Sequence, residues 1–335
     1  MEKNKIFLVI PTIRDLDFLE FWGSKFKKIY GVIVEDSPVK KIKTPIKYFK
    51  KVYHYTWKDI DNELKDNSWI IPRKNAGIRI YGFLKAYQMG ADIIVTLDDD
   101  CYPIKNQNFL NQHIKNLNLK APIDNWFSTY PHKRIPFTRG FPYKIRNKSE
   151  VVLSHGLWTN KLDLDAKSEI KIKNLNEPIL SENYRQFIPK DFFFPLCSMN
   201  FAFKAKITPI LFFPMMGYDK DGNKWSFDRY DDIWAGIFAK KVLDHLNLSV
   251  VNGIPFIEHR KASDVKLNLE KERLGMIVNE YLYKEVAKVK LTKKDLKEAY
   301  LELFDKIDFS SRVFQQKDYF LKLKKAVRIW TDLFL

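Results

Sequence analysis

The sequence predicts an α/β fold built on a mixed, mostly parallel sheet with flanking helices. In the amino-terminal half, short apolar runs alternate with segments of helical periodicity, which is typical of parallel strands joined by covering helices. Three aspartates directly follow one of these runs, at the strand end where open α/β sheets bind ligands. Helical periodicity fills the end of the chain. We therefore expect a catalytic domain over residues 1–265 and a carboxyl-terminal helical extension over residues 266–335.

Apolar runs bounded by glycine, proline or acidic residues predict the strands, and apolar residues three or four positions apart predict the helices. The first predicted helix follows the first strand, and Asp15 is placed to cap it. In the tail, Thr292 to Asp295 resembles a capping box. The predicted strands are residues 6–10, 31–35, 93–97, 192–203 and 250–256, and the predicted helices run through residues 16–29 and 81–87 and begin near residue 231.

The composition is that of a globular chain, with 335 residues of which 45% are hydrophobic. A net charge of +17 suits nucleic acid, an anionic membrane surface or a small anionic substrate. Because the excess charge is spread along the chain and no zinc-finger, KH or RNP1 motif occurs, we expect no nucleic-acid partner. No apolar stretch is long enough for a membrane span or a secretion signal, so we expect a cytoplasmic protein. Cys101 and Cys197 are expected to be reduced packing residues.

The aspartate run offers a site for a divalent cation. Asp98 and Asp100 form an Asp-x-Asp pattern that suits Mn²⁺ or Mg²⁺, with the remaining positions left to water and a diphosphate. The alternative is a solvated turn closed by an aspartate side chain. His259 follows the last predicted strand and is a candidate third ligand, unless it is an ordinary surface histidine.

Three further residues are candidates for nucleotide contacts. Asp36 follows the second predicted strand, where a carboxylate can bind a ribose hydroxyl or a base edge, although a turn-forming aspartate before Pro38 explains it equally well. Arg79 begins a predicted helix, and either it or Arg73 is placed to bind a phosphate. Neither a Gly-x-Gly-x-x-Gly nor a Walker sequence is present, so neither a dinucleotide oxidoreductase nor a P-loop enzyme is expected. A metal-bridged nucleotide remains, as in nucleotide-sugar enzymes of the GT-A type.

The second half of the chain contains polar and aromatic residues suited to a sugar. Trp158 is a candidate for stacking on a sugar face, and a core tryptophan is the alternative. His155 is a candidate for a hydrogen bond to a substrate hydroxyl or phosphate; the alternative is a loop histidine whose hydrogen bonds are made within the protein. Asp231 and Asp232 are candidates for base catalysis, although acids in the first turn of a helix are also favoured by its dipole.

Seven ordered segments match motifs of one known family. They are Pro11 to Glu20, Asp98 to Cys101, Arg139 to Pro142, Ser154 to Trp158, Met199 to Phe203, Arg229 to Gly236 and His259 to Ser263. On these segments the chain resembles the reversibly glycosylated polypeptides, or UDP-arabinopyranose mutases, from Ile10 to about Lys271.

The resemblance implies a GT-A-like fold, a divalent metal at the aspartates, and interconversion of the pyranose and furanose forms of a nucleotide-linked sugar. In that family an arginine of the Arg-Gly-aromatic-Pro segment becomes glycosylated, and an arginine seven positions later is needed; these map onto Arg139 and Arg146. We also expect nucleotide-sugar contacts from matched residues in three of the segments. These residues are Thr12, Arg14, Asp99 and Asn200.

Ring contraction requires C1 to be released from the ring oxygen and recaptured by O4, so a covalent carrier for C1 is useful. We hypothesise that Arg139 captures C1 from a UDP-sugar while metal at Asp98 and Asp100 neutralises the leaving group. A neighbouring carboxylate such as Asp231 or Asp232 must then accept the guanidinium proton. Alternatively, Arg139 is a diphosphate clamp.

Two departures from the plant members leave the sugar and the nucleotide open. Residues 217–225 form a longer, charged insert, and the loop over residues 130–135 differs. A metal-dependent retaining glycosyltransferase, or a self-glycosylating protein, is the alternative function. The helical tail can pack on the sheet or on another subunit, so a homo-oligomer is possible.

Overall fold

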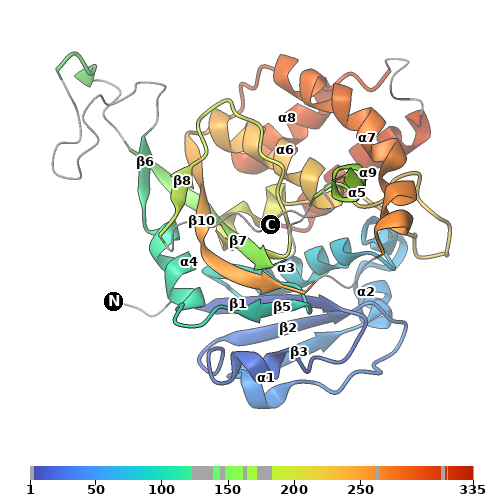
Figure 1. The fold of residues 1–335 in the computed structure, drawn as a ribbon. Helices are drawn as coiled ribbons and strands as arrows, with labels where there is room; N and C mark the ends of the chain where they lie inside the picture. The colour runs from blue at the N-terminus through green and yellow to red at the C-terminus, as the bar shows by residue number, and fades with distance from the viewer. Residues whose placement is uncertain are drawn as a thin grey trace.

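The computed structural model describes residues 4–122, 139–143, 148–160, 164–171, 183–260, 264–310, 314 and 316–334. One sheet runs through the molecule, with helices packed on both of its faces (Figure 1). Its strand order is β3-β2-β1-β4-β9-β7-β10-β5, with β6 paired to β7 and β8 paired to β10. The strands are β1 Ile6–Thr12, β2 Tyr30–Glu35, β3 Lys51–Tyr55, β4 Ile93–Leu97, β5 Cys101–Pro103, β6 Lys120–Pro122, β7 Lys148–Asn160, β8 Arg185–Phe187, β9 Asn200–Lys204 and β10 Leu248–His259.

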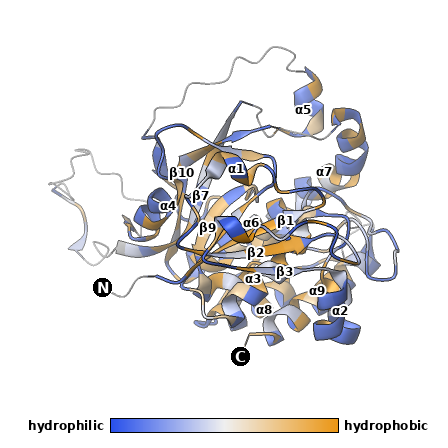
Figure 2. Ribbon diagram, turned by 90° about the horizontal axis from the view of Figure 1, so that it is seen from below, coloured by the Kyte–Doolittle hydropathy of each residue, from blue (hydrophilic) through white to orange (hydrophobic). Residues whose placement is uncertain are grey.

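The first four strands along the chain pair in parallel, in the order β3, β2, β1 and β4. Their carboxyl ends therefore meet at one edge of the sheet, where Thr12 lies in register with Glu35. Among them, hydrophobic residues are concentrated in β1 and β2 (Figure 2), whereas β3 is the edge strand. Alternate residues of β1 belong to different cores, with Phe7 and Val9 on one face and Leu8 and Ile10 on the other. This burial on both faces explains the continuous apolar runs in the sequence.

The rest of the sheet is mixed. β9 runs antiparallel to β4, with Leu97 opposite Asn200, and β10 runs parallel to β7. β5 runs antiparallel to β10, with Cys101 opposite His259. The start of β9 and the end of β10 consequently arrive at the same edge as the carboxyl ends of the parallel strands. Parallel pairing covers more of the registered residues than antiparallel pairing does.

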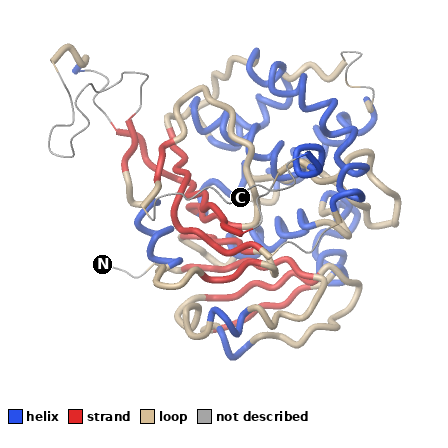
Figure 3. The backbone as a smooth tube through the Cα atoms, in the orientation of Figure 1, coloured by secondary structure: helices blue, strands red, loops and turns tan. Residues whose placement is uncertain are grey.

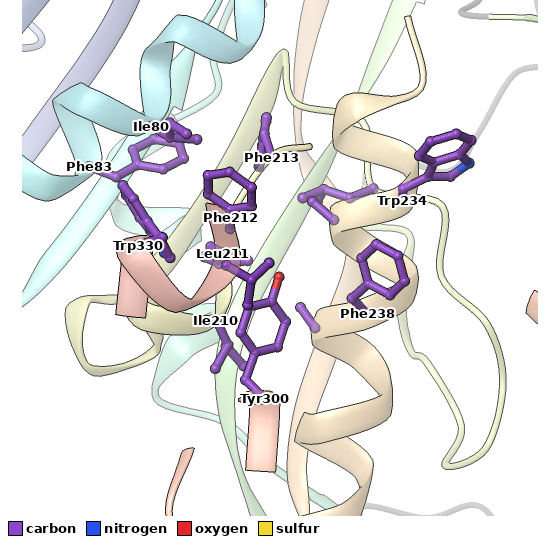
Figure 4. Close-up of a cluster of buried hydrophobic side chains, with 14 of the residues drawn as sticks. Ile80, Phe83, Ile210, Leu211, Phe212, Phe213, Trp234, Phe238, Tyr300 and Trp330 are labelled. Carbon is purple, nitrogen blue, oxygen red and sulfur yellow. The ribbon is translucent and has the colours of Figure 1, made fainter. Parts of the chain in front are cut away.

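Helices cover the two faces unequally (Figure 3). Side chains of α2, α3, α6, α7, α8 and α9 pack in the larger core, whereas α1 and α4 contribute to the smaller one. Figure 4 shows the larger core where Phe212 meets Trp330 of α9, with ring centroids 5.7 Å apart. The helices are α1 Leu19–Trp22, α2 Trp57–Leu64, α3 Arg79–Gln88, α4 Phe109–Leu117, α5 Ala166–Lys171, α6 Asp231–His245, α7 Val265–Lys288, α8 Leu296–Lys306 and α9 Lys317–Asp332, with 3-10 turns at Ile46–Tyr48, Lys65–Ile70, Ala76–Ile78 and Ala205–Ile210.

The predicted class is confirmed in its mixed sheet, its flanking helices and its helical extension, which begins with α7. The predicted strands 6–10, 31–35 and 93–97, and the helix beginning near Asp231, are also present. Among the described residues, no helix combines the length and apolarity that crossing a bilayer requires.

Several predicted element boundaries are wrong. The first helix is only Leu19–Trp22, because Gly23 ends it with a φ of +55°. Its N-cap is Phe18, so Asp15 does not cap it. The strand predicted over residues 192–203 shrinks to β9, since the segment before Asn200 is irregular and Phe192 is 62% exposed. In the tail, Asp295 rather than Thr292 caps α8, accepting from the amides of its first turn.

Candidate functional site

Polar residues that follow several strands converge at the carboxyl edge of the parallel strands. Thr12 ends β1, Asp36 follows β2 and Asp98 follows β4. The amino termini of α3 and α6 also reach this edge, as the ion pair between Arg79 and Asp98 and the bond between Ser198 and Asp232 demonstrate. We take this edge as the candidate site.

The three aspartates after β4, which we call the acidic turn, point in three directions. Asp98 Oδ1 lies 2.7 Å from Arg79 Nη2. Thr12 Oγ1 donates to Asp99 Oδ2 at 2.7 Å. Asp100 Oδ2 lies 3.7 Å from His259 Nε2 on the end of β10. Asp100 and His259 therefore face each other across the end of β10, whereas Asp98 faces Arg79.

The donor set of the acidic turn fits a divalent cation. Oδ1 of Asp98 is buried against Arg79, yet the side chain as a whole keeps 27% of its surface exposed and that of Asp100 keeps 19%. Burial raises the pKa of Asp98; the Arg79 charge opposes the increase and the Asp100 charge adds to it. A divalent cation would offset this crowded negative charge, and carboxylate oxygens suit Mn²⁺ or Mg²⁺. In the described part of the chain no three histidine, cysteine or acidic side chains are placed to hold a metal ion together, so a cation at the acidic turn would need further ligands from water or a diphosphate.

Thr12 and Arg14, expected from the family segments, both contact Asp99. Arg14 Nε lies 3.2 Å from Asp99 Oδ2, and the Arg14 side chain is 47% exposed at the rim of the site. Burial raises the pKa of Asp99 to about 6, although the Thr12 bond and the Arg14 charge oppose that increase. Asp99 thus holds the end of β1 against the acidic turn and leaves part of Arg14 facing solvent.

Asp36 binds the segment that precedes α3. Its Oδ1 accepts from Trp57 Nε1 at 2.7 Å and from the Lys74 amide at 3.0 Å, and its Oδ2 accepts from the Asn75 amide at 2.9 Å. Burial raises the Asp36 pKa, with these bonds opposing the increase. Both carboxylate oxygens are therefore bonded to the protein, as expected for a turn-forming aspartate.

Asp231 and Asp232 begin α6 beside Arg79. Burial, helped by the neighbouring charge of Asp232, raises the pKa of Asp231 to about 8. Asp232 Oδ2 accepts from the Ser198 amide at 2.9 Å, and the Ser198 carbonyl accepts from Arg79 Nη1 at 2.7 Å. The two carboxylates begin the same helix, and the negative charge of Asp232 favours the protonated form of Asp231. Such a pair can take up a proton and return it.

His155 and Trp158 lie on β7 at the base of the site. His155 Nε2 accepts from the Cys197 amide at 3.3 Å, so Nδ1 carries the proton and donates to Asn252 Oδ1 at 2.7 Å. The rings of His155 and Trp158 meet edge to face with centroids 6.0 Å apart. His155 is buried, whereas Trp158 is partly exposed. The structure thus places Trp158, rather than His155, where a ligand can reach it.

Asn200 connects four elements of the fold and is fully buried. Its Nδ2 donates to the carbonyls of Leu157 and Pro255, both at 3.0 Å, and its Oδ1 accepts from His113 Nε2 at 3.0 Å. Burial lowers the pKa of His113 to about 3, so this α4 histidine is neutral. Sequence reasoning missed His113, since a histidine within a helical pattern carries no local sign of a partner on a distant strand.

Arg139, the first of the two family arginines, is not brought to the acidic turn. Arg139 is exposed in the described segment 139–143, which stands beyond β6 in Figure 1. Arg146 lies outside the described residues. Ser198 and Gly77 are further site residues that sequence reasoning missed. A Cβ added at Gly77 would lie 2.9 Å from Asp231 Oδ2, so the glycine makes room for that carboxylate; a signal was present, because Gly77 stands directly before a predicted helix.

Comparisons with known proteins identify relatives along the whole chain. Probable UDP-arabinopyranose mutase 1 of Zea mays is 35% identical over 343 residues, covering 98% of this chain and 90% of the relative. UDP-arabinopyranose mutase 2 of Arabidopsis thaliana is also 35% identical over 343 residues, covering 98% of this chain and 91% of its own. A crystal structure of glucosyl-3-phosphoglycerate synthase from Mycobacterium tuberculosis, in complex with Mn²⁺, UDP-glucose and phosphoglyceric acid, superposes with a TM-score of 0.40 at 11% identity, covering 82% of this chain and 79% of that one.

The family expected from the seven sequence segments is confirmed by a match over the entire length. The model described as reversibly glycosylated polypeptide covers residues 1–335. Both plant relatives exceed one third identity across nearly all of the chain. The chain therefore belongs to the reversibly glycosylated polypeptide family.

Proposed function

We propose that this protein is a mutase that interconverts the pyranose and furanose forms of a UDP-linked sugar, UDP-arabinopyranose or a close relative. The observation that carries the proposal is the alignment with relatives named UDP-arabinopyranose mutase over 98% of the chain. The acidic turn at the carboxyl edge of the parallel strands supports it, because a nucleotide diphosphate needs a cation there.

Asp98, Asp100 and His259 are the residues that would hold Mn²⁺ or Mg²⁺. When bound, the ion would neutralise the diphosphate and make it a better leaving group. Arg14 is suited to a phosphate because its guanidinium is partly exposed beside Asp99. Trp158 is suited to the sugar because it is partly exposed on β7.

Asp36, Thr12, His155 and Asn200 contribute by shaping these surfaces. Each of them bonds mainly to other parts of the protein, at the distances given above. We assign them to the nucleotide-sugar site as residues that position its backbone and neighbouring side chains. Only their solvent-accessible atoms can contact the ligand directly.

Arg139 is proposed as the carrier of the sugar. The bond between C1 and the diphosphate oxygen breaks, a bond between C1 and a guanidinium nitrogen forms, and the nitrogen loses a proton. The ring oxygen then leaves C1 with a proton, O4 attacks C1 and loses one, and the diphosphate finally reclaims C1 as the furanose. Asp231 and Asp232 take up and return the guanidinium proton, which requires segment 139–143 to reach the acidic turn in the working enzyme.

The test is chromatography of UDP-arabinopyranose and other nucleotide sugars after incubation with the purified protein and Mn²⁺, with and without chelator. A new isomeric nucleotide-sugar peak that chelator abolishes is the expected result. UDP release that depends on an added acceptor would instead establish a retaining glycosyltransferase. No change for any donor would contradict both.

A second measurement separates the two roles considered for Arg139. Carrier and diphosphate clamp both predict an inactive Arg139→Ala variant, so activity does not distinguish them. Mass spectrometry of the protein quenched during turnover does, because a carrier shows a sugar mass on the peptide that contains Arg139. A clamp shows no such adduct although isomerisation proceeds.

A further inference from the structure

The guanidinium of Arg79 is completely enclosed by the protein beside the acidic turn. Its side chain has no exposed surface. Nε donates to the Ala76 carbonyl at 3.0 Å, and Nη1 donates to Thr96 Oγ1 at 3.1 Å and to the Ser198 carbonyl at 2.7 Å. Nη2 lies 2.7 Å from Asp98 Oδ1. A head group held from four sides in this way is not presented to a phosphate.

A buried cation at this position balances buried negative charge. The carboxylates of Asp98, Asp231 and Asp232 all stabilise the charged form of Arg79. Without the guanidinium, three acids would lie close together with no cation among them, which is strongly unfavourable away from water. The same charge that keeps the acids in place also repels any second cation that approaches the acidic turn.

We propose that Arg79 is an internal counter-ion that competes with the divalent cation for the acidic turn, so that metal binds well only when a nucleotide diphosphate brings additional negative charge. The inference rests on the proposed function in one respect, namely that Asp98 and Asp100 hold the cation. It assigns Arg79 a role in setting metal affinity in place of the phosphate contact predicted from the sequence.

The geometry explains how the competition works. One oxygen of Asp98 is committed to Arg79, which leaves only Oδ2 for an incoming ion. Asp100 faces His259 at 3.7 Å, so the second half of the donor set is free of the guanidinium. With part of the acidic charge already neutralised, the acidic turn alone attracts a divalent ion weakly. A diphosphate supplies the missing charge and further oxygen ligands at the moment when the ion is needed.

The experiment measures Mn²⁺ binding by the electron paramagnetic resonance signal of free Mn²⁺, with and without UDP. Three variants are compared with the wild type. Arg79→Met removes the positive charge, and Arg79→Lys keeps the charge without the planar guanidinium group. Lys240→Met is the matched control. Lys240 is also a buried cation, paired with Asp244 at 2.6 Å, but it lies within α6 away from the acidic turn.

The wild type is expected to bind Mn²⁺ much more tightly with UDP than without it. Arg79→Met should bind Mn²⁺ without UDP about tenfold more tightly than the wild type, because one nearby positive charge is gone. Arg79→Lys and Lys240→Met should resemble the wild type. Mn²⁺ should also raise the melting temperature of Arg79→Met more than that of the wild type. Unchanged or weaker Mn²⁺ binding by Arg79→Met would overturn the inference.

A second pair of variants covers the case in which Arg79→Met does not fold without metal. Asp98→Asn and the double variant Arg79→Met/Asp98→Asn differ only in the guanidinium of Arg79. The double variant leaves no unpaired buried charge at position 98. The double variant should bind Mn²⁺ about tenfold more tightly than Asp98→Asn; equal affinities would overturn the inference. A wild type that binds no Mn²⁺ even with UDP would instead contradict the proposed metal-dependent function.

Discussion

The carboxylate of Asp231 lies directly against Gly77, where a single Cβ would come within 2.9 Å of its Oδ2. The same Cβ would meet Asn75 Oδ1 at 2.8 Å, and Asn75 is itself bound through its amide to Asp36. The absence of a side chain at this one position therefore lets the segment that Asp36 binds pack against the start of α6.

Gly77→Ala is expected to displace Asp231 and lower kcat by about 100-fold, since small shifts of a catalytic group have effects of that size. Steady-state isomerisation kinetics measure the effect. The matched control is Gly31→Ala, whose Cβ would meet the Phe49 ring at 2.9 Å in the core away from the site. Both variants should lose stability, but only Gly77→Ala should lose kcat, and equal losses of kcat would contradict the assignment of Asp231.

Asp231 should make the protein less stable as the pH rises. Its folded-state pKa is raised from 3.8 to about 8, so the folded protein retains a proton that the unfolded chain releases. The stability associated with this proton is present at low pH and is lost as the pH rises through that interval. Asp231→Asn removes this pH dependence. The free energy of unfolding of the variant minus that of the wild type should therefore be about 1 to 3 kcal/mol larger at about pH 8 than at about pH 5.

Urea denaturation of both proteins at the two pH values gives this comparison. Because the difference between the proteins is used, the titration of groups that do not interact with Asp231 cancels. A difference that does not change with pH would mean that Asp231 is charged throughout the interval.

Asp100→Asn should weaken Mn²⁺ binding in the presence of UDP by at least about 100-fold. The amide keeps the size of the side chain but removes the charge that faces both the cation and His259. Electron paramagnetic resonance titration measures the affinity, and excess Mn²⁺ should partly restore isomerisation. Asp318→Asn, which removes an exposed acid from the first turn of α9, should leave both properties unchanged.

Asn200→Ala is expected to destabilise the protein by about 2 to 4 kcal/mol, because three buried hydrogen-bonding partners lose their contact. They are the carbonyls of Leu157 and Pro255 and the ring of His113. The midpoint of urea unfolding measures the loss. If Asn200 instead served only as a ligand contact, the variant would keep its stability and raise KM alone.

β1, β2 and β4 were predictable because both of their faces are buried, which leaves uninterrupted apolar runs such as Ile6–Ile10. β3 was not predicted, since most of its residues are not buried. β7 was not predicted, although it is the longest strand described. It carries buried polar residues, among them Ser154, whose hydroxyl bonds to His113 and Asn116 of α4. Polar side chains in a sequence usually indicate a loop, but here they are hydrogen-bonded to residues of a distant helix, which the sequence does not reveal.

The place of the site was predictable from the sheet, but the partners of its side chains were not. That carboxylates after β4 face a ligand follows from topology alone. That Arg79 turns inward to Asp98, or that Asp36 binds the Asn75 amide, depends on how α3 docks against the sheet. The boundary at residue 265, the roles of the individual site residues, the cytoplasmic location, the lack of a nucleic-acid partner and a possible homo-oligomer stay predictions.

β5, which directly follows the acidic turn, pairs with β10 at the far end of the sheet's strand order. Cys101 and its partner His259 stand about 160 positions apart along the chain. At a translation rate of about 5–20 residues per second, on the order of ten seconds or more separates their emergence from the ribosome. Throughout that interval the nascent chain carries its three aspartates without the strand that flanks them. The proposed metal site can therefore reach its finished geometry only after the chain has been synthesised as far as His259.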